Sequence, residues 1–196
     1  RKLVKPQRRI VHQLFERLGL SGEFSRTEII SSDIDVYDIL SEIRIYLNDG
    51  NYEKVDELIS EMENNINSQI SQNKQVALRL KACNMRVSKG IENGDFIKII
   101  KEALECTIPY DVAISKNEKY MTNEEISCIN NIMVTKDTRF KEVEECYNAM
   151  LYMYESKETM LNNWLCMYEF VMHPVASLSG DWGKYDLSDE KEQIIM

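Results

Sequence analysis

The polar side chains with the clearest binding chemistry lie on segments that the hydrophobic pattern predicts to be helices. The candidate ligand-binding residues are Arg44, Asn84, Asn131, Asn163 and His173. An Asn amide both donates and accepts hydrogen bonds, which suits it to hold the backbone of an extended peptide. Each of these residues could equally be a solvated position on a helix surface. They indicate a binding function only if the fold brings them to one face.

Spacings typical of catalytic, cofactor or metal sites do not occur in this sequence. It contains no glycine-rich phosphate loop, no HExxH or CxxC pattern and no GxSxG turn. The two histidines, His12 and His173, are far apart in sequence. The cysteines are Cys83, Cys106, Cys128, Cys146 and Cys166, and we expect free thiols packed as small hydrophobes in a reducing compartment. The sequence therefore predicts no catalytic residues, no metal and no cofactor, and hence not an enzyme.

Apolar residues recur at spacings of three and four over most of the chain, which predicts an all-α fold. Only 7 Gly and 3 Pro among 196 residues argue against a turn-rich β fold. One helix should begin at Asn51 or Tyr52, another can be capped by Asp95, and Thr122 with Glu125 forms the pattern of a capping box. Pro109 should break the chain, with a loop over residues 108–120.

A repeat of about 44 residues is the strongest signal in the sequence. The repeated aromatic residues are Tyr52, Phe96, Phe140 and Tyr185, with spacings of 44, 44 and 45. The residues two positions before them are Gly50, Gly94, Thr138 and Gly183. Gly allows a tight turn out of a helix, and a fixed period in this range is typical of stacked helical repeats. The pattern predicts about four helical hairpins, and the alternative is four ordinary hairpins whose spacing agrees by chance.

Charge divides the chain into a basic head and an acidic body. Residues 1–26 hold seven Lys/Arg against two Glu, whereas the whole chain has a net charge of −9. The acidic body repels nucleic acid, so only the head could contact it, unless the bias of so short a segment is accidental. No run of about 18 apolar residues is present. We therefore expect a cytoplasmic protein with no membrane partner.

Several segments resemble known bacterial regulators. Residues 9–23 (RIVHQLFERLGLSGE) resemble the last helix and exit of a Cro/XRE-type helix-turn-helix DNA-binding domain. Residues 103–109, 121–126 and 129–133 resemble the regulatory region of Firmicute regulators of the peptide-sensing RRNPP type. The Gly-x-aromatic turns are similar to those of tetratricopeptide hairpins, whose usual period is about 34 residues.

The resemblance implies two parts. Residues 1–26 would be the remnant of the DNA-binding domain and a linker. Residues 27–196 would form a superhelical array of about four tetratricopeptide-like hairpins that is truncated at the C-terminal end. The resemblance further implies a homodimer that binds a short signalling peptide in quorum sensing and contacts DNA through an N-terminal domain missing from this chain. Asn131, before Ile132 and Met133, matches the family's groove-facing Asn, with Met133 in place of a small residue. The alternative is a tetratricopeptide-like protein-interaction scaffold that does not bind DNA.

Overall fold

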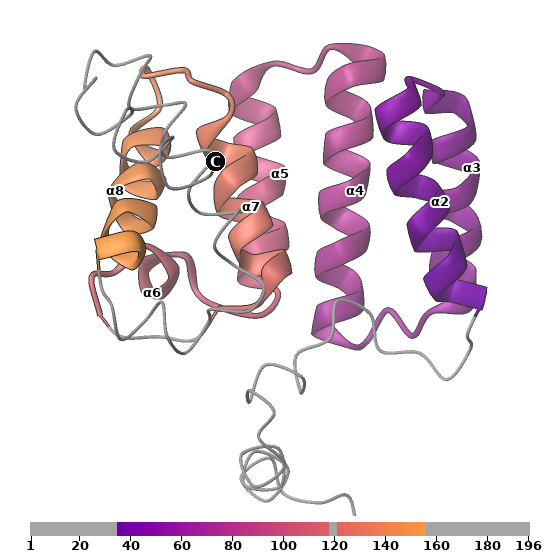
Figure 1. Ribbon diagram of the computed structural model, residues 1–196, viewed down its shortest axis with the longest axis horizontal. Helices are drawn as coiled ribbons and strands as arrows, with labels where there is room; N and C mark the ends of the chain where they lie inside the picture. Colours follow the sequence, from indigo (N-terminus) through magenta and orange to yellow (C-terminus); the bar gives the residue numbers. More distant parts are fainter. Residues whose placement is uncertain (1–34, 118–120, 156–196) are drawn as a thin grey trace, which may run out of the picture.

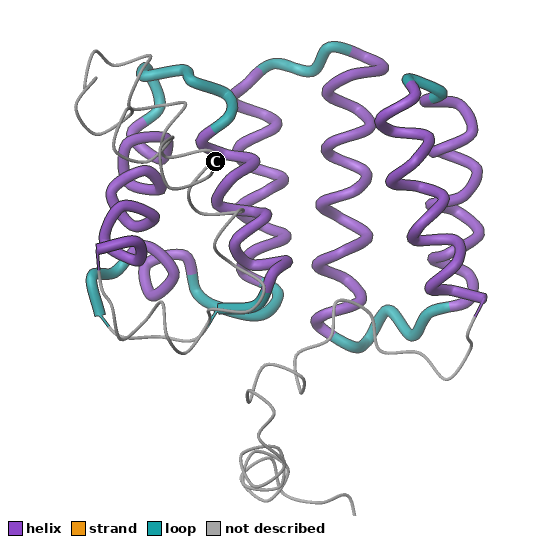
Figure 2. The backbone as a smooth tube through the Cα atoms, viewed as in Figure 1, coloured by secondary structure: helices purple, strands orange, loops and turns teal. Residues whose placement is uncertain are grey.

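The computed structural model describes residues 35–117 and 121–155, and this part of the chain is built from helices and loops (Figures 1 and 2). The helices are α2 (Asp35–Asp49), α3 (Tyr52–Asn65), α4 (Ser71–Lys89), α5 (Asn93–Glu105), α6 (Tyr110–Ile114), α7 (Asn123–Met133) and α8 (Lys141–Glu155). The all-α prediction is confirmed for these residues. The predicted DNA-binding remnant at 1–26 and the fourth predicted hairpin lie outside them.

The first pair of helices, α2 and α3, is joined by a turn whose local signals were predicted correctly. Gly50 follows α2 with a φ of +75°, a backbone conformation that L side chains rarely adopt. Asn51 then caps α3, because its side-chain oxygen accepts a hydrogen bond from the Lys54 amide at 3.3 Å. These adjacent residues reverse the chain and bring α3 against α2.

The second turn differs from the prediction. The left-handed residue that ends α4 is Gly90, with a φ of +62°, whereas Gly94 lies within the first turn of α5. Asp95 is likewise inside α5 and does not cap it. The predicted equivalence of the 44-residue turns is therefore wrong here: Tyr52 is the first residue of α3, but Phe96 is the fourth of α5. The physical reason is that Gly90 already provides the turn four residues earlier.

Gly94 has a different use, which is close packing. A Cβ atom added at Gly94 would lie 3.1 and 3.2 Å from two ring atoms of Phe140. The ring that precedes α8 thus rests on the first turn of α5. Two positions of the sequence repeat contact one another, so the glycine accommodates a neighbouring unit and does not form a turn.

The third pair, α7 and α8, begins with the predicted capping box. The Thr122 N–H donates to Glu125 Oε2 at 2.7 Å, and the Glu125 N–H donates to Thr122 Oγ1 at 3.1 Å. Within residues 108–117 of the predicted loop the chain forms a short helix, α6, which starts directly after Pro109 and packs against α8. Proline suits this place because the first helical turn needs no amide donor.

Buried apolar side chains form two core clusters. The first lies among α2, α3 and α4 and is centred on Ile43, Ile59 and Met62. The second extends from α4 to α8 and includes Phe96 and Tyr147. Helix α4 belongs to both: its residues Val76, Ala77 and Leu80 pack in the first cluster, and Ala82 packs in the second. Each cluster therefore depends on a different flank of the same helix.

The helices contact one another largely in chain order. Helix α3 packs on α4, α4 on α5, α5 on α7 and α7 on α8. Figure 1 shows them side by side, from α2 and α3 at one end to α6 and α8 at the other. Among residues 35–117 and 121–155, no helix has both the length and the apolar character needed to cross a membrane.

Candidate functional site: a polar face on α2, α4 and α7

A largely buried ion pair joins the first helices of the second and third pairs. Arg79 on α4 donates from Nε to Glu124 Oε2 at 2.5 Å and from Nη2 to Oε1 at 2.8 Å. The exposed fraction of the side chain is 13% for Arg79 and 3% for Glu124. Two parallel bonds to one carboxylate give both strength and a fixed orientation. Glu124 also lies in the first turn of α7, where the helix dipole favours a negative charge.

A second guanidinium approaches the same carboxylate from α2. Arg44 Nη2 lies 3.8 Å from Glu124 Oε1, and 45% of the Arg44 side chain is exposed. This distance allows attraction but exceeds that of a hydrogen bond. The first helices of all three described pairs therefore meet at Glu124. Burial alone would lower the pKa of the Arg79 guanidinium, but the charge and hydrogen bonds of Glu124 outweigh it, so this pKa is raised.

Two thiols follow the ion pair one helical turn further on. Cys83 comes four residues after Arg79 and Cys128 four residues after Glu124, so each continues the same helix face. Burial raises the pKa of both thiols, that of Cys128 well above its ordinary value. Protonated thiols of this kind are poor nucleophiles and behave as small apolar side chains. This agrees with the free thiols predicted for these positions.

Among the predicted ligand-binding residues, Asn131 lies on the same side of α7 as Glu124. It lies seven residues, or about two turns, further along α7. Its side-chain Oδ1 is buried and accepts no hydrogen bond. Such an acceptor is costly unless a partner reaches it. Asn131 and Arg44 thus both belong to the three helices that meet at Glu124.

Asn84 does not fit its predicted role. It is fully buried, and its Nδ2 donates to the Tyr52 carbonyl oxygen at 3.1 Å and to Asp56 Oδ1 at 2.6 Å. These bonds tie α4 to the start of α3. Five residues along a helix rotate Asn84 by about 140° from Arg79, toward the first core cluster. The other two candidates, Asn163 and His173, lie outside the described residues.

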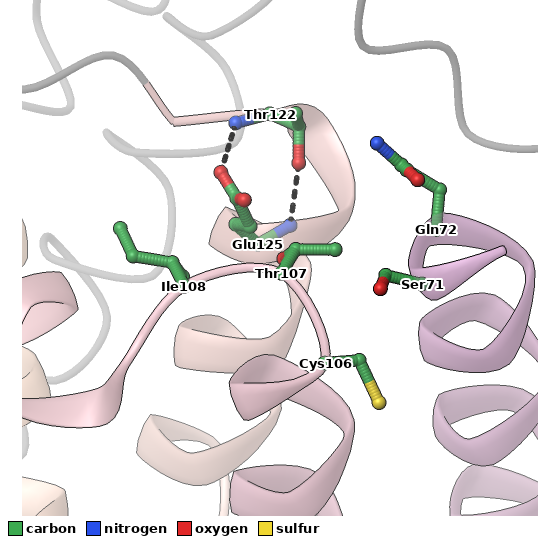
Figure 3. Close-up of a pocket in the computed structure, with 7 residues that line it drawn as sticks. All are labelled: Ser71, Gln72, Cys106, Thr107, Ile108, Thr122 and Glu125. Atoms are coloured by element: carbon green, nitrogen blue, oxygen red, sulfur yellow. Dashed lines mark hydrogen bonds between the residues drawn. The ribbon is translucent and has the colours of Figure 1, made fainter.

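A pocket with a volume of about 320 Å³ lies at the ends of α4, α5 and α7 (Figure 3). Its lining residues are Ser71, Gln72, Cys106, Thr107, Ile108, Thr122 and Glu125. Several polar groups in its wall already have partners within the protein. Thr122 and Glu125 form the capping box, and Thr107 Oγ1 accepts a bond from Gln75 Nε2 at 2.9 Å. The pocket is therefore a weaker candidate than the face that meets at Glu124.

A second polar network, which the sequence did not predict, links α5, α6 and α8. Lys101 Nζ lies 3.2 Å from Glu142 Oε1 and 4.2 Å from the centre of the Tyr110 ring. The Tyr110 hydroxyl donates to Glu145 Oε2 at 2.9 Å. Burial, followed by Cys146 and Glu145, raises the pKa of Tyr110. These contacts join Lys101, Tyr110 and the two glutamates to one another within the protein, and we assign them to packing between helices.

Across the described part of the chain, no group of three or more His, Cys, Asp or Glu side chains is arranged to hold a metal ion. Comparison with known proteins adds no assignment. The chain matches no protein-family model, no curated protein and no solved structure. A functional proposal therefore rests on the face formed by Arg44, Arg79, Glu124 and Asn131, which we call the polar face.

Proposed function

We propose that the chain is a peptide-binding regulatory domain of a cytoplasmic transcriptional regulator, with its helix pairs stacked as tetratricopeptide-like repeats. The observation that supports this proposal most is that Arg44, Arg79 and Glu124, from three different helices, come together on the polar face. Its residues come from α2, α4 and α7, the first helices of the three described pairs. In stacked helical repeats, corresponding helices of successive units line one extended binding surface.

The repeat register supports the stacking. Arg79 and Glu124 are bonded across an offset of 45 residues, and Cys83 and Cys128 are related by the same offset. This offset is close to the 44-residue spacing of the aromatic residues. The Arg79–Glu124 bonds join α4 and α7 at positions about one repeat length apart, which is consistent with first helices of neighbouring units lying side by side.

The chemistry of the polar face suits a peptide backbone. The unsatisfied Oδ1 of Asn131 can accept a bond from a peptide N–H, which would remove a desolvation cost of about 1–3 kcal/mol. Guanidinium groups on the same helices can bind carbonyl or carboxylate oxygens. A flexible peptide can lie along these helices and use both kinds of group.

Peptide binding can be tested directly by presenting the chain with a random peptide library and sequencing the peptides it retains. We expect a defined peptide class to be enriched, and Asn131→Ala to weaken its binding at least about fivefold through loss of one hydrogen bond. The matched control is Asn64→Ala, which changes an exposed amide on α3. Enrichment that Asn131→Ala leaves unchanged would contradict this use of the polar face.

The regulatory part of the proposal includes a homodimer whose geometry responds to the peptide and a DNA-binding domain that precedes the repeats. It is supported by the basic head and by the resemblance of residues 9–23. We expect the full gene product to bind a duplex from its own upstream region, more weakly at about 200 mM than at about 50 mM salt. The peptide should change that affinity through a population shift. A full product that binds no DNA and instead retains a protein partner would favour the scaffold.

A further inference from the structure

A hollow with a volume of about 450 Å³ runs along α5, beside the start of α8. The α5 residues that line it recur at spacings of three and four, so they share one side of the helix. We call them the α5 stripe: Gly94, Ile97, Lys98, Lys101, Glu102 and Glu105. The stripe covers almost the whole length of α5. None of its residues belongs to the polar face.

The charges of the α5 stripe are complementary to those of a second, antiparallel copy. Lys98 and Lys101 come first along the helix, and Glu102 and Glu105 follow. A two-fold axis between positions 101 and 102 would place Lys98 opposite the partner's Glu105 and Lys101 opposite the partner's Glu102. Each of these pairs would occur twice, as two-fold symmetry requires. Lys98, Glu102 and Glu105 are exposed and form no ion pair with the other described residues, whereas Lys101 is bonded to Glu142.

The charge of the whole chain makes such a surface significant. Two copies with a net charge of −9 each repel one another, so a contact between copies is least opposed where opposite charges meet. Helix α3 does not offer this, because it carries five acidic residues and one lysine. Helix α4 has basic residues and no acidic ones. On α5, by contrast, cations face anions, and antiparallel helices also place opposite ends of their dipoles together.

Apolar surface is present at both ends of the α5 stripe. At the N-terminal end, the Phe140 ring borders the hollow next to Gly94 and the buried Ile97. Beyond the C-terminal end, Val112 on α6 has 47% of its surface exposed. An antiparallel arrangement brings the segment after one α5 toward the start of the other. Val112 of the partner subunit would therefore approach the hollow beside Phe140 and could bury apolar surface there.

We propose that the α5 stripe is the interface of a homodimer, in which a second copy of this chain packs antiparallel against it. This inference rests on the homodimer of the proposed function and names its interface, and it does not depend on peptide binding. Helix α5 has 13 residues and is about 20 Å long. The contact is therefore small, and we expect a dissociation constant on the order of 10 µM. A ligand can readily shift so weak an equilibrium.

The test measures self-association of the full chain by sedimentation velocity over a concentration series. Lys98→Glu and Glu105→Lys each turn two symmetry-related attractions into repulsions, and each should weaken the dimer at least about tenfold. A mixture of these two variants has opposite charges at both pairs again, so it should form a heterodimer with about the wild-type affinity. The matched controls Lys89→Glu on α4 and Glu61→Lys on α3 reverse exposed charges elsewhere and should dimerise like wild type. Circular dichroism checks that each variant is folded.

A dimer that forms equally well in wild type and in both single variants would overturn the α5 interface and leave the proposed homodimer intact. Loss of the dimer in the single variants without recovery in their mixture would overturn the charge pairing. A wild-type chain that stays monomeric above about 100 µM would overturn both the interface and the homodimer. Peptide retention by wild type, measured separately, reports on the peptide-binding function whatever the state of association.

Discussion

Breaking the Arg79–Glu124 pair should destabilise the protein far more than removing the pair as a whole. Replacing Glu124 leaves Arg79 as an uncompensated charge in a site where only 13% of its side chain is exposed. Broken buried pairs cost about 3–5 kcal/mol, and we expect about 3 kcal/mol for Glu124→Leu because Arg79 keeps some contact with water. With a typical urea m-value of about 2 kcal/mol/M, the unfolding midpoint would fall by about 1.5 M.

The informative experiment is a double-mutant cycle followed by circular dichroism at helix wavelengths during urea unfolding. Arg79→Met alone should cost less than Glu124→Leu alone, since the Arg44 guanidinium, 3.8 Å from Glu124 Oε1, still faces the carboxylate. The double variant replaces both charges with apolar groups of similar size and should return to within about 1 kcal/mol of wild type. The matched control is Glu57→Gln, which breaks an exposed pair with Lys54 and should cost no more than about 0.5 kcal/mol.

Two results would refute this reasoning. Single variants that cost less than about 1 kcal/mol would mean that the pair behaves like an exposed one. A double variant whose cost equals the sum of the two single costs would mean that the side chains act independently. In either case the meeting of α2, α4 and α7 at Glu124 would not depend on charge pairing.

Four further predictions concern Gly90, Gly94 and Cys146. Gly90→Ala should cost about 1 kcal/mol of unfolding free energy, because its φ of +62° disfavours L residues although the added Cβ has open space. Gly94→Ala should show the expected helix-propensity gain of about 0.5–1 kcal/mol only in a Phe140→Ala background, because the Phe140 ring crowds the new methyl group. The pKa of Cys146 is raised to about 12 by burial, so in native protein at pH 8 iodoacetamide should modify the partly exposed Cys106 before the buried Cys146. Stability should also fall as pH rises above about 9, because an unfolded thiol ionises near pH 8.5 whereas folded Cys146 does not.

Urea unfolding measures both glycine predictions, and mass spectrometry measures the labelling. If Gly90→Ala left the free energy of unfolding unchanged, the left-handed backbone conformation at Gly90 would not be maintained in solution. An equal effect of Gly94→Ala with and without Phe140 would contradict the contact between α5 and the start of α8. Labelling of Cys146 at the same rate as Cys106 would contradict its burial, and Cys146→Ala should reduce the alkaline loss of stability.

Local signals in the sequence were sufficient for several helix boundaries. The start of α3 at Asn51 or Tyr52 and the Thr122–Glu125 capping box were predicted, because the interacting residues at each helix start are at most three positions apart. Gly50 was also predicted correctly, since it directly follows the last turn of an apolar-periodic segment. Interactions of this range depend on residue type and spacing, which a single sequence displays in full.

Interactions between distant segments could not be found in the same way. Arg79 and Glu124 are 45 residues apart, and Lys101 and Glu142 are 41 apart. Which of these residues pair depends on which faces of the helices meet in the fold. The sequence around each residue does not indicate its partner. Arg44 lies on α2, in a segment that the sequence predicted to be helical. The sequence prediction misjudged Asn84 because the choice between a ligand face and a core face depends on the position of α3.

The sharing of α4 between two cores limits how such a chain can be rearranged by recombination. A segment ending before α4 would lose Val76 and Leu80 from the first core, and one beginning after α4 would lose Ala82 from the second. The hairpin alone is therefore not a transferable part. A segment that is duplicated or exchanged must bring all the helices that bury its core. The smallest such segment is a helix pair together with the helix that follows it.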